Sequence, residues 1–280
     1  MIVDCHTHLM TEEQWGPIFA AEYHKVADRN RSLSLGVTAE EHWQACAGAD
    51  RVIVFGLNAR YLQIETPNEQ IAGYVASHPE KLIGFVALDP ADPDVLDELE
   101  RGVQDLKLRG IKVGPMYQDV DPLDERFHEI YRRAERDGLP ILFHMATSFP
   151  AAARLRYANP IRLDEVGIRY PELRVIIAHM GMPWFDDTIQ TIRKHPHFYA
   201  DTSIGDKPWW LYNALVAFHE WGVMHKLLLG SDFPVLTLEE QIAAFRRVNA
   251  VVEGTGLPSV PDVQIDEIVH RDTLALLGLT

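Results

Sequence analysis

The chain has 280 residues, of which 47% are hydrophobic and 24% are charged, so its composition excludes wholesale disorder and supplies a substantial core. A formal net charge of -15 argues against a broad electrostatic grip on nucleic acid or on an acidic membrane face. Two cysteines exclude a disulfide framework, and no apolar run approaches the roughly 20 residues that a membrane span needs. We therefore expect a globular cytoplasmic protein with no nucleic-acid or membrane partner.

Eight short apolar runs rich in Val, Ile, Leu and Phe are predicted to be strands. In chain order they are Ile2–Leu9, Arg51–Leu57, Leu82–Leu88, Gly110–Pro115, Pro140–Thr147, Leu173–Met180, Phe198–Ile204 and Lys226–Asp232. Apolar residues return every three or four positions in several intervening segments, which predicts helices at Pro93–Leu108, Asp124–Asp137 and Trp209–Trp221. Alternating strands and helices pair in parallel, and eight such units closing on themselves predict an α/β fold of the (β/α)8 TIM-barrel type, in one domain over residues 1–280.

A doubly wound open sheet is the alternative topology, but it would place its chemistry at one switch point rather than at many strand ends. The segment Met10–Asp50 is longer than one crossover helix needs, so we expect this long first βα loop to hold a cap or lid. Leu236–Val252 and Asp266–Leu279 are predicted to be two helices, which gives the barrel an extra C-terminal helix.

Metal-binding types of side chain lie at the carboxyl ends of the predicted strands, where barrels of this class hold their active sites. His6 and His8 are two residues apart on the first strand, so they face the same side. His144 follows PILF in the fifth strand, His179 follows VIIA in the sixth and Asp232 follows LLLGS in the eighth. Any one of these histidines taken alone is better explained as a hydrogen-bonded core residue. Together, five such groups on one rim predict a catalytic divalent metal site.

A second His-x-His pair provides a comparison within the same chain. His195 and His197 precede the seventh strand, at the end of the barrel opposite the predicted site, and Pro196 lies between them. We expect this pair to lie in a solvated loop.

Three or four nitrogen and oxygen ligands with an open coordination position suit zinc, and a carboxylate among them also tolerates manganese or iron. Such an ion activates water and polarises a substrate carbonyl. One residue must then remain free to move protons. We expect His179 to be the general base or acid, and Asp232 both to bind the metal and to contact the water.

The chain resembles the amidohydrolase superfamily, and specifically the amidohydrolase-related branch that includes aminocarboxymuconate-semialdehyde decarboxylase. The resemblance rests on Asp-x-His-x-His in the first strand and on GIKVGP, PILFH, VIIAHMG and LLLGSDFP in later strands. It implies one metal held by His6, His8, His144 and Asp232, with His179 in acid/base duty. The tail DEIVHRDTLALLGL resembles the closing helix of the family, with Asp-Thr in place of the usual Asn-Ala.

Lys112 on the fourth strand leaves a second arrangement open. In binuclear members of this superfamily a lysine at this strand is carboxylated and bridges two metals. The GIKVGP motif resembles the mononuclear branch instead, in which this lysine is no bridge, and the simplest explanation is a charge at the barrel mouth that pairs with a carboxylate.

Candidate substrate contacts are Arg29 and Arg31 in the long first loop, Lys112, Tyr117 after the fourth strand and Trp184 after the sixth. Scattered charge on a surface helix is the simpler explanation of the two arginines.

Two further groups of residues have expected structural roles. Asp4 either orients a ligand or satisfies neighbouring backbone donors. Trp209, Trp210 and Trp221 lie at helical spacing and are expected to pack into the protein.

These features predict a metal-dependent hydrolase of a small carboxylated or cyclic substrate, such as a lactone or an amide. Non-oxidative decarboxylation of a small unsaturated or aromatic acid would use the same metal site and is the closest alternative. A barrel that binds a ligand without catalysis is an alternative of another class, although such a scaffold has no need of five convergent metal-type groups. The family resemblance and the exposed long loop favour a homodimer.

Overall fold

The structure, a computed structural model, describes residues 1–30, 34–205 and 207–280. Its strands pair in parallel in two runs, of order β1-β2-β3 and β4-β5-β6-β7-β8-β9. The strands are β1 (Val3–His8), β2 (Arg51–Phe55), β3 (Leu82–Gly84), β4 (Val86–Ala87), β5 (Ile111–Val113), β6 (Ile141–Phe143), β7 (Val175–Ile177), β8 (Phe198–Asp201) and β9 (Leu227–Leu228). All eight predicted strands are present, and the third is divided into β3 and β4 at Phe85.

The two runs close into one ring. Phe85 N donates to Val54 O at the junction of β3 and β4, at 3.1 Å. On the other side, Cys5 N donates to Leu229 O and His8 N donates to Phe233 O, each at 2.9 Å, so the segment after β9 pairs with β1. A ring without a free edge confirms the predicted barrel and excludes the open sheet.

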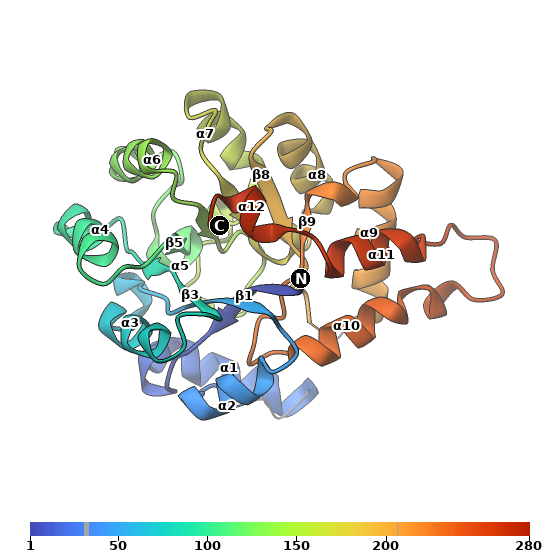
Figure 1. Cartoon of the computed structure of the whole chain (residues 1–280), viewed down its shortest axis with the longest axis horizontal. Helices are drawn as coiled ribbons and strands as arrows, with labels where there is room; N and C mark the ends of the chain where they lie inside the picture. The colour runs from blue at the N-terminus through green and yellow to red at the C-terminus, as the bar shows by residue number, and fades with distance from the viewer. Residues whose placement is uncertain (31–33, 206) are drawn as a thin grey trace.

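Helices surround this ring (Figure 1). They are α1 (Gly16–Asn30), α2 (Ala39–Ala45), α3 (Asn68–Ser77), α4 (Val95–Gln104), α5 (Pro115–Gln118), α6 (Glu125–Asp137), α7 (Leu163–Arg169), α8 (Phe185–Lys194), α9 (Pro208–Glu220), α10 (Leu238–Arg246), α11 (Asp262–Val269) and α12 (Thr273–Leu277). In α6 the residues Phe127, Ile130 and Ala134 recur at helical spacing and are buried, so this helix packs one apolar face on the barrel. Gly138 in the left-handed region ends the same helix.

The last predicted helix is wrong in one respect. Asp266–Leu279 is not continuous, because α11 ends at Val269 and a separate α12 begins at Thr273. The Asp272 side chain accepts a hydrogen bond from Ala275 N, so this aspartate caps a new helix instead of continuing the old one. Leu274, on α12, packs with residues from the barrel interior, and Figure 1 shows α12 across the centre of the ring beside the N-terminus.

Two expectations about the surface are also wrong. Trp209, Trp210 and Trp221 are 56%, 41% and 47% exposed, so they do not serve as core packing residues. The prediction of a solvated loop is wrong for His195, which is buried with its Nε2 2.9 Å from Asp164 Oδ1, because the turn before β8 folds back against α7. His197 is only half-buried.

Within the described ranges, no helix combines the length and the apolar character that crossing a membrane requires.

Candidate metal centre

Three side chains meet at the carboxyl end of β1 and bring their ligand atoms to one point. His6 Nε2 and His8 Nε2 are 3.3 Å apart. Asp232 Oδ1, from the segment after β9, lies 3.2 Å from the first and 3.4 Å from the second. The strand period of two places both rings on one side of β1, and ring closure brings Asp232 next to them. We call these three residues the ligand cluster.

The donor set of the ligand cluster fits a divalent metal. Ligand atoms that share a tetrahedral zinc at about 2.0–2.1 Å lie about 3.3 Å from one another, which is the spacing in the cluster. Burial would raise the pKa of Asp232, but His179 and His6 outweigh it and hold the pKa well below its ordinary value, so Asp232 is a carboxylate. Burial lowers the pKa of His8 to about 3, so its ring is neutral. Burial and a neighbouring lysine would lower the pKa of His6, but Asp201 and Asp232 outweigh them and raise it, so a metal ion that binds this ring competes with a proton for it. One carboxylate and two imidazoles form a typical ligand set for zinc or manganese.

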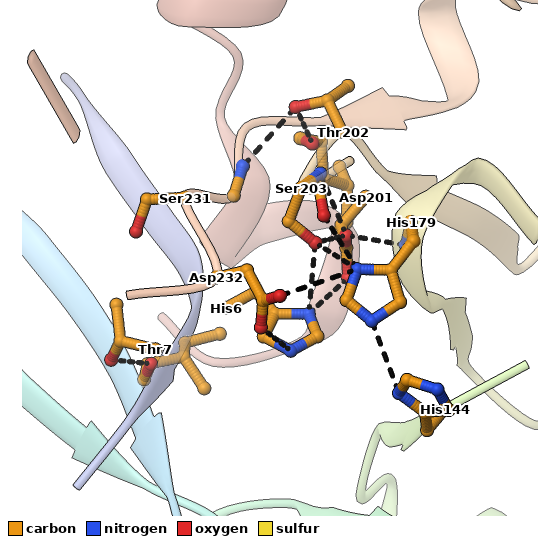
Figure 2. A network of polar contacts seen from close by, with 12 residues as sticks. His6, Thr7, His144, His179, Asp201, Thr202, Ser203, Ser231 and Asp232 are labelled. Carbon is orange, nitrogen blue, oxygen red and sulfur yellow. Dashed lines mark hydrogen bonds and ion pairs between the residues drawn. The ribbon is translucent and has the colours of Figure 1, made fainter. Parts of the chain in front are cut away.

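Asp201, at the end of β8, orients His6 and was not singled out by the sequence analysis. His6 Nδ1 lies 2.8 Å from Asp201 Oδ2, so the ring proton is held on Nδ1 and Nε2 presents its lone pair to the ligand cluster (Figure 2). The pKa of Asp201 is held below its ordinary value, because His6 and its hydrogen bond outweigh the effect of burial. The sequence offered only a partial signal, because Asp201 is a carboxylate inside the predicted strand Phe198–Ile204, whereas the structure ends β8 at this residue.

His179 is held by Ser203. Its Nδ1 lies 2.7 Å from the Ser203 carbonyl oxygen, so the ring proton is on Nδ1 and Nε2 carries the lone pair. Burial lowers the pKa of His179, which keeps the ring neutral. Its Nδ1 is also 4.0 Å from Asp232 Oδ2, so a neutral histidine lies beside a carboxylate.

The backbone is strained at both His179 and Asp232. His179 and Asp232 each have a φ of 58°, in the left-handed region that side chains other than glycine rarely adopt. Strain of this kind costs of order 1–3 kcal/mol per residue and gathers at functional sites.

His144 lies next to His179 but outside the ligand cluster of the described residues. Its Nδ1 is 3.2 Å from His179 Nε2, and Figure 2 shows the two rings facing each other. Its Nε2 is 3.1 Å from the Tyr117 hydroxyl, which lies 2.6 Å from Ser148 Oγ. His144 therefore belongs to a hydrogen-bonded chain in this structure, and its role as a fourth metal ligand stays a prediction.

Lys112 is buried beside the ligand cluster and does not make the expected ion pair. Its Nζ lies 3.5 Å from His6 Nε2 and 4.4 Å from the centre of the Phe55 ring, and within the described part of the chain no carboxylate lies at ion-pair distance. Burial lowers the pKa of Lys112 to about 8, because carboxylates nearby offset only part of the desolvation. A second group of metal-type atoms, from His6, His179 and Asp201, shares His6 with the ligand cluster. The number of metals stays a prediction.

A cavity of about 350 Å³ opens above the ligand cluster. Most of its wall is apolar or aromatic, and α1 with the turn before it contributes Trp15, Phe19 and Tyr23. Trp15 and Phe19 stack with ring centres 4.6 Å apart. The long first loop therefore covers the cavity as the predicted cap. Two cations line the described part of the wall, Lys112 at the floor and the exposed Lys207.

The other residues predicted to contact the substrate do not all line the cavity. Tyr117 lines the cavity. Trp184 is outside the lining and packs, half-buried, against the apolar cluster that contains Tyr117. Arg31 and the side chain of Arg29 lie outside the described residues. The sequence analysis also did not select Lys207 or the aromatic residues of α1 as substrate contacts.

Asp4 serves neighbouring backbone donors. Its Oδ1 accepts from His6 N at 3.2 Å and from Ser231 N at 3.0 Å. Burial raises the pKa of Asp4 to about 6. The backbone role considered for this residue is therefore the observed one.

Residues 3–258 match the family model described as amidohydrolase. The chain belongs to the amidohydrolase family. The resemblance found in the sequence is thereby confirmed. A curated relative of this amidohydrolase is the gamma-resorcylate decarboxylase of Rhizobium sp. (strain MTP-10005), which is 26% identical over 140 residues. That match covers 41% of this chain and 43% of the relative, so it spans less than half of the relative's length.

Proteins of the same fold whose structures are solved are named for different reactions. A dihydroxybenzoic acid decarboxylase from Polaromonas sp. JS666 with bound manganese has a TM-score of 0.69 at 19% identity, over 99% of this chain and 97% of that one. A probable 2-pyrone-4,6-dicarboxylic acid hydrolase from Acinetobacter baumannii has a TM-score of 0.68 at 15% identity, over 99% of both chains. At these identities the likeness shows the barrel fold alone.

Proposed function

We propose that this amidohydrolase is a metal-dependent hydrolase of a small carboxylated or cyclic substrate, such as a lactone or an amide. The observation that carries the proposal is the neutral ring of His179, which lies beside Asp232 of the ligand cluster in the wall of an apolar cavity. Hydrolysis begins by removing a proton from water, and a neutral histidine next to a carboxylate supplies the acceptor that this step needs.

His6, His8 and Asp232 would hold the metal, and His144 is proposed as a fourth ligand. A divalent ion at this place, zinc or manganese, polarises a substrate carbonyl and activates water. The manganese in the Polaromonas structure supports an ion of this class.

The proton moves through His179. Its Nε2 takes a proton from water as the water oxygen bonds to the carbonyl carbon of the substrate. The bond from this carbon to the leaving oxygen or nitrogen then breaks, and the leaving atom receives the same proton back from Nε2. The Ser203 carbonyl oxygen, 2.7 Å from Nδ1, holds the ring in the orientation and tautomer that this exchange needs.

The cavity selects small anionic substrates. Its volume of about 350 Å³ lies near the lower end of ligand pockets. The aromatic residues of α1 offer flat apolar surface to a ring, and Lys112 with Lys207 offers the positive charge that a carboxylate needs.

The experiment begins with elemental analysis of the purified protein, and zinc or manganese near one equivalent per chain is expected. A panel of lactones, amides and aromatic acids is then supplied to the metal-loaded protein, with ring opening followed by absorbance and carbon dioxide measured in parallel. Metal-dependent ring opening or amide cleavage supports the proposal. A protein that binds neither metal would refute it.

Decarboxylation is the second candidate, because the curated relative and several similar structures carry decarboxylase names. In that reaction the carbon–carbon bond to the carboxylate breaks and the ring carbon gains a proton. Release of carbon dioxide without ring opening, from an aromatic acid, would select this candidate over hydrolysis.

Assembly and location remain proposals. We propose one domain, a cytoplasmic location and a homodimer, and the exposed Trp209 and Trp210 at the start of α9 suit a self-association surface. Size-exclusion chromatography with light scattering measures the mass in solution.

A further inference from the structure

His42, on α2, is buried and hydrogen-bonded to the strand that carries the metal-type histidines. Its Nε2 lies 2.9 Å from Thr7 Oγ1, and Thr7 stands between His6 and His8 on β1. Its Nδ1 lies 2.9 Å from the Tyr74 hydroxyl on α3. Nothing in the proposed chemistry uses His42.

The direction of these hydrogen bonds is fixed by counting protons. The Thr7 hydroxyl donates its one hydrogen to Ile53 O at 2.8 Å, so it can only accept from His42. The ring proton of His42 is therefore on Nε2, and Nδ1 accepts from Tyr74. Burial lowers the pKa of His42 to about 4, which keeps the ring neutral, with one donor and one acceptor. Both ring nitrogens of His42 and the hydroxyl groups of Thr7 and Tyr74 therefore take part in hydrogen bonds.

Thr7 occupies a place where β1 departs from regular pairing. Asp4 pairs with Val52 and Thr7 pairs with Val54, so three steps along β1 face two steps along β2. Such a bulge next to an active site re-aims the side chains that follow it. The Thr7 hydroxyl ties the strand back to β2 just after the bulge, and His42 holds that hydroxyl in place.

The same ring also packs against the residue that follows Asp232. The Phe233 ring packs edge-on against His42, with centres 5.7 Å apart, and Phe233 directly follows Asp232. The backbones of Thr7 and Phe233 form a parallel β-bridge, in which His8 N donates to Phe233 O. His42 thus contacts both segments that carry the three ligand atoms.

We propose that His42 is a positioning residue for the metal centre: by donating to Thr7 behind the bulge of β1, and by packing on Phe233, it sets the geometry at which His6, His8 and Asp232 meet. The proposal rests on the proposed metal site. It concerns how tightly and in what geometry the metal is held, and not the reaction that follows.

The test compares metal binding in wild type and in His42→Phe, which keeps a buried ring but removes both hydrogen bonds. Zinc affinity is measured by competition with a chelator, and the cobalt-substituted protein is compared by its visible absorption spectrum. Loss of groups that orient metal ligands typically weakens binding by about 10–100-fold, and we expect a loss in this range with an altered cobalt spectrum.

Three further variants separate positioning from general destabilisation. His42→Gln keeps an N–H donor at the end of the side chain and should restore most of the zinc affinity. Thr7→Val removes the acceptor, so it should weaken zinc binding like His42→Phe, and the double variant should be no weaker than either single one. His128→Phe is the matched control, because His128 is also buried and its Nδ1 lies 2.9 Å from the Tyr170 hydroxyl, away from the ligand cluster. It should destabilise the metal-free protein and leave zinc affinity unchanged.

If His42→Phe folds and binds zinc with wild-type affinity and spectrum, the proposal is overturned while the proposed function stands. If His42→Phe does not fold, Thr7→Val decides in the same way. A wild-type protein that binds neither zinc nor cobalt overturns the proposed metal site itself, and this inference with it.

Discussion

Asp201 Oδ2 lies 2.8 Å from His6 Nδ1, and this contact decides which nitrogen of His6 is free to bind a metal. His8 differs, because its Nδ1 is buried without a hydrogen-bond partner among the described residues. The two histidines of one motif are therefore unequal, and His6 is the better oriented ligand.

Asp201→Asn should weaken zinc binding by about 10–100-fold, because an amide oxygen is a poorer acceptor for the His6 N–H than a carboxylate. Competition with a chelator measures the affinity. Asp164→Asn is the matched control, since Asp164 contacts His195 at 2.9 Å on the far side of the barrel. Equal zinc affinity in Asp201→Asn and wild type would contradict the orienting role.

His179→Gln should lower kcat by about 10²–10⁴-fold on any substrate found, because it removes the group that accepts and returns the proton. Zinc content should stay at the wild-type level, since the ligand cluster does not include His179. Elemental analysis and steady-state kinetics on the same sample separate the two effects. A variant that loses metal and activity together would assign His179 to metal binding instead.

Lys112→Met should stabilise the metal-free protein at pH 7 by an amount on the order of 3 kcal/mol. Burial lowers the pKa of Lys112 to about 8 in the folded state, so below pH 8 the fold carries a buried charge at a cost. Between about pH 8 and 10.5 the unfolded chain binds more protons than the folded one, so the wild type regains stability as the pH rises.

Urea unfolding of the metal-free protein at pH 7 and pH 9.5 measures this difference. The gain from Lys112→Met should be smaller at pH 9.5. Lys25→Met, at a lysine whose side chain is 66% exposed, should give no such dependence. An equal gain at both pH values would mean that Lys112 is not a buried cation.

Lys207→Gln should raise KM for a carboxylated substrate by roughly two- to fivefold and leave kcat unchanged, because an exposed ion pair contributes at most about 1 kcal/mol. The effect should shrink at high salt, since screening weakens exposed charges. Lys194→Gln, at an exposed lysine paired with Asp164, is the control. A fall in kcat with constant KM would place Lys207 in the chemistry rather than at the cavity mouth.

The barrel was predictable from sequence because its signals are local. Runs such as RVIVF and RVII are apolar on both faces, and only strands covered on both sides bury them fully. His6 and His8 were found for the same reason, since a period of two fixes their common side without knowledge of any partner. Asp232 followed from its place at a strand end.

Contacts between distant parts of the chain were decided by the tertiary structure. Asp201 is 195 residues from His6, and His42 reaches Thr7 from a helix, so neither pairing leaves a periodic trace in the sequence. Lys112 shows the same limit: its chemical type suggested an ion pair, while burial against Phe55 and His6 left it without one among the described residues. Whether a segment forms a strand depends on the hydrophobic pattern of a few consecutive residues. The protonation state and the orientation of a side chain depend instead on the neighbours that closure of the barrel brings next to it.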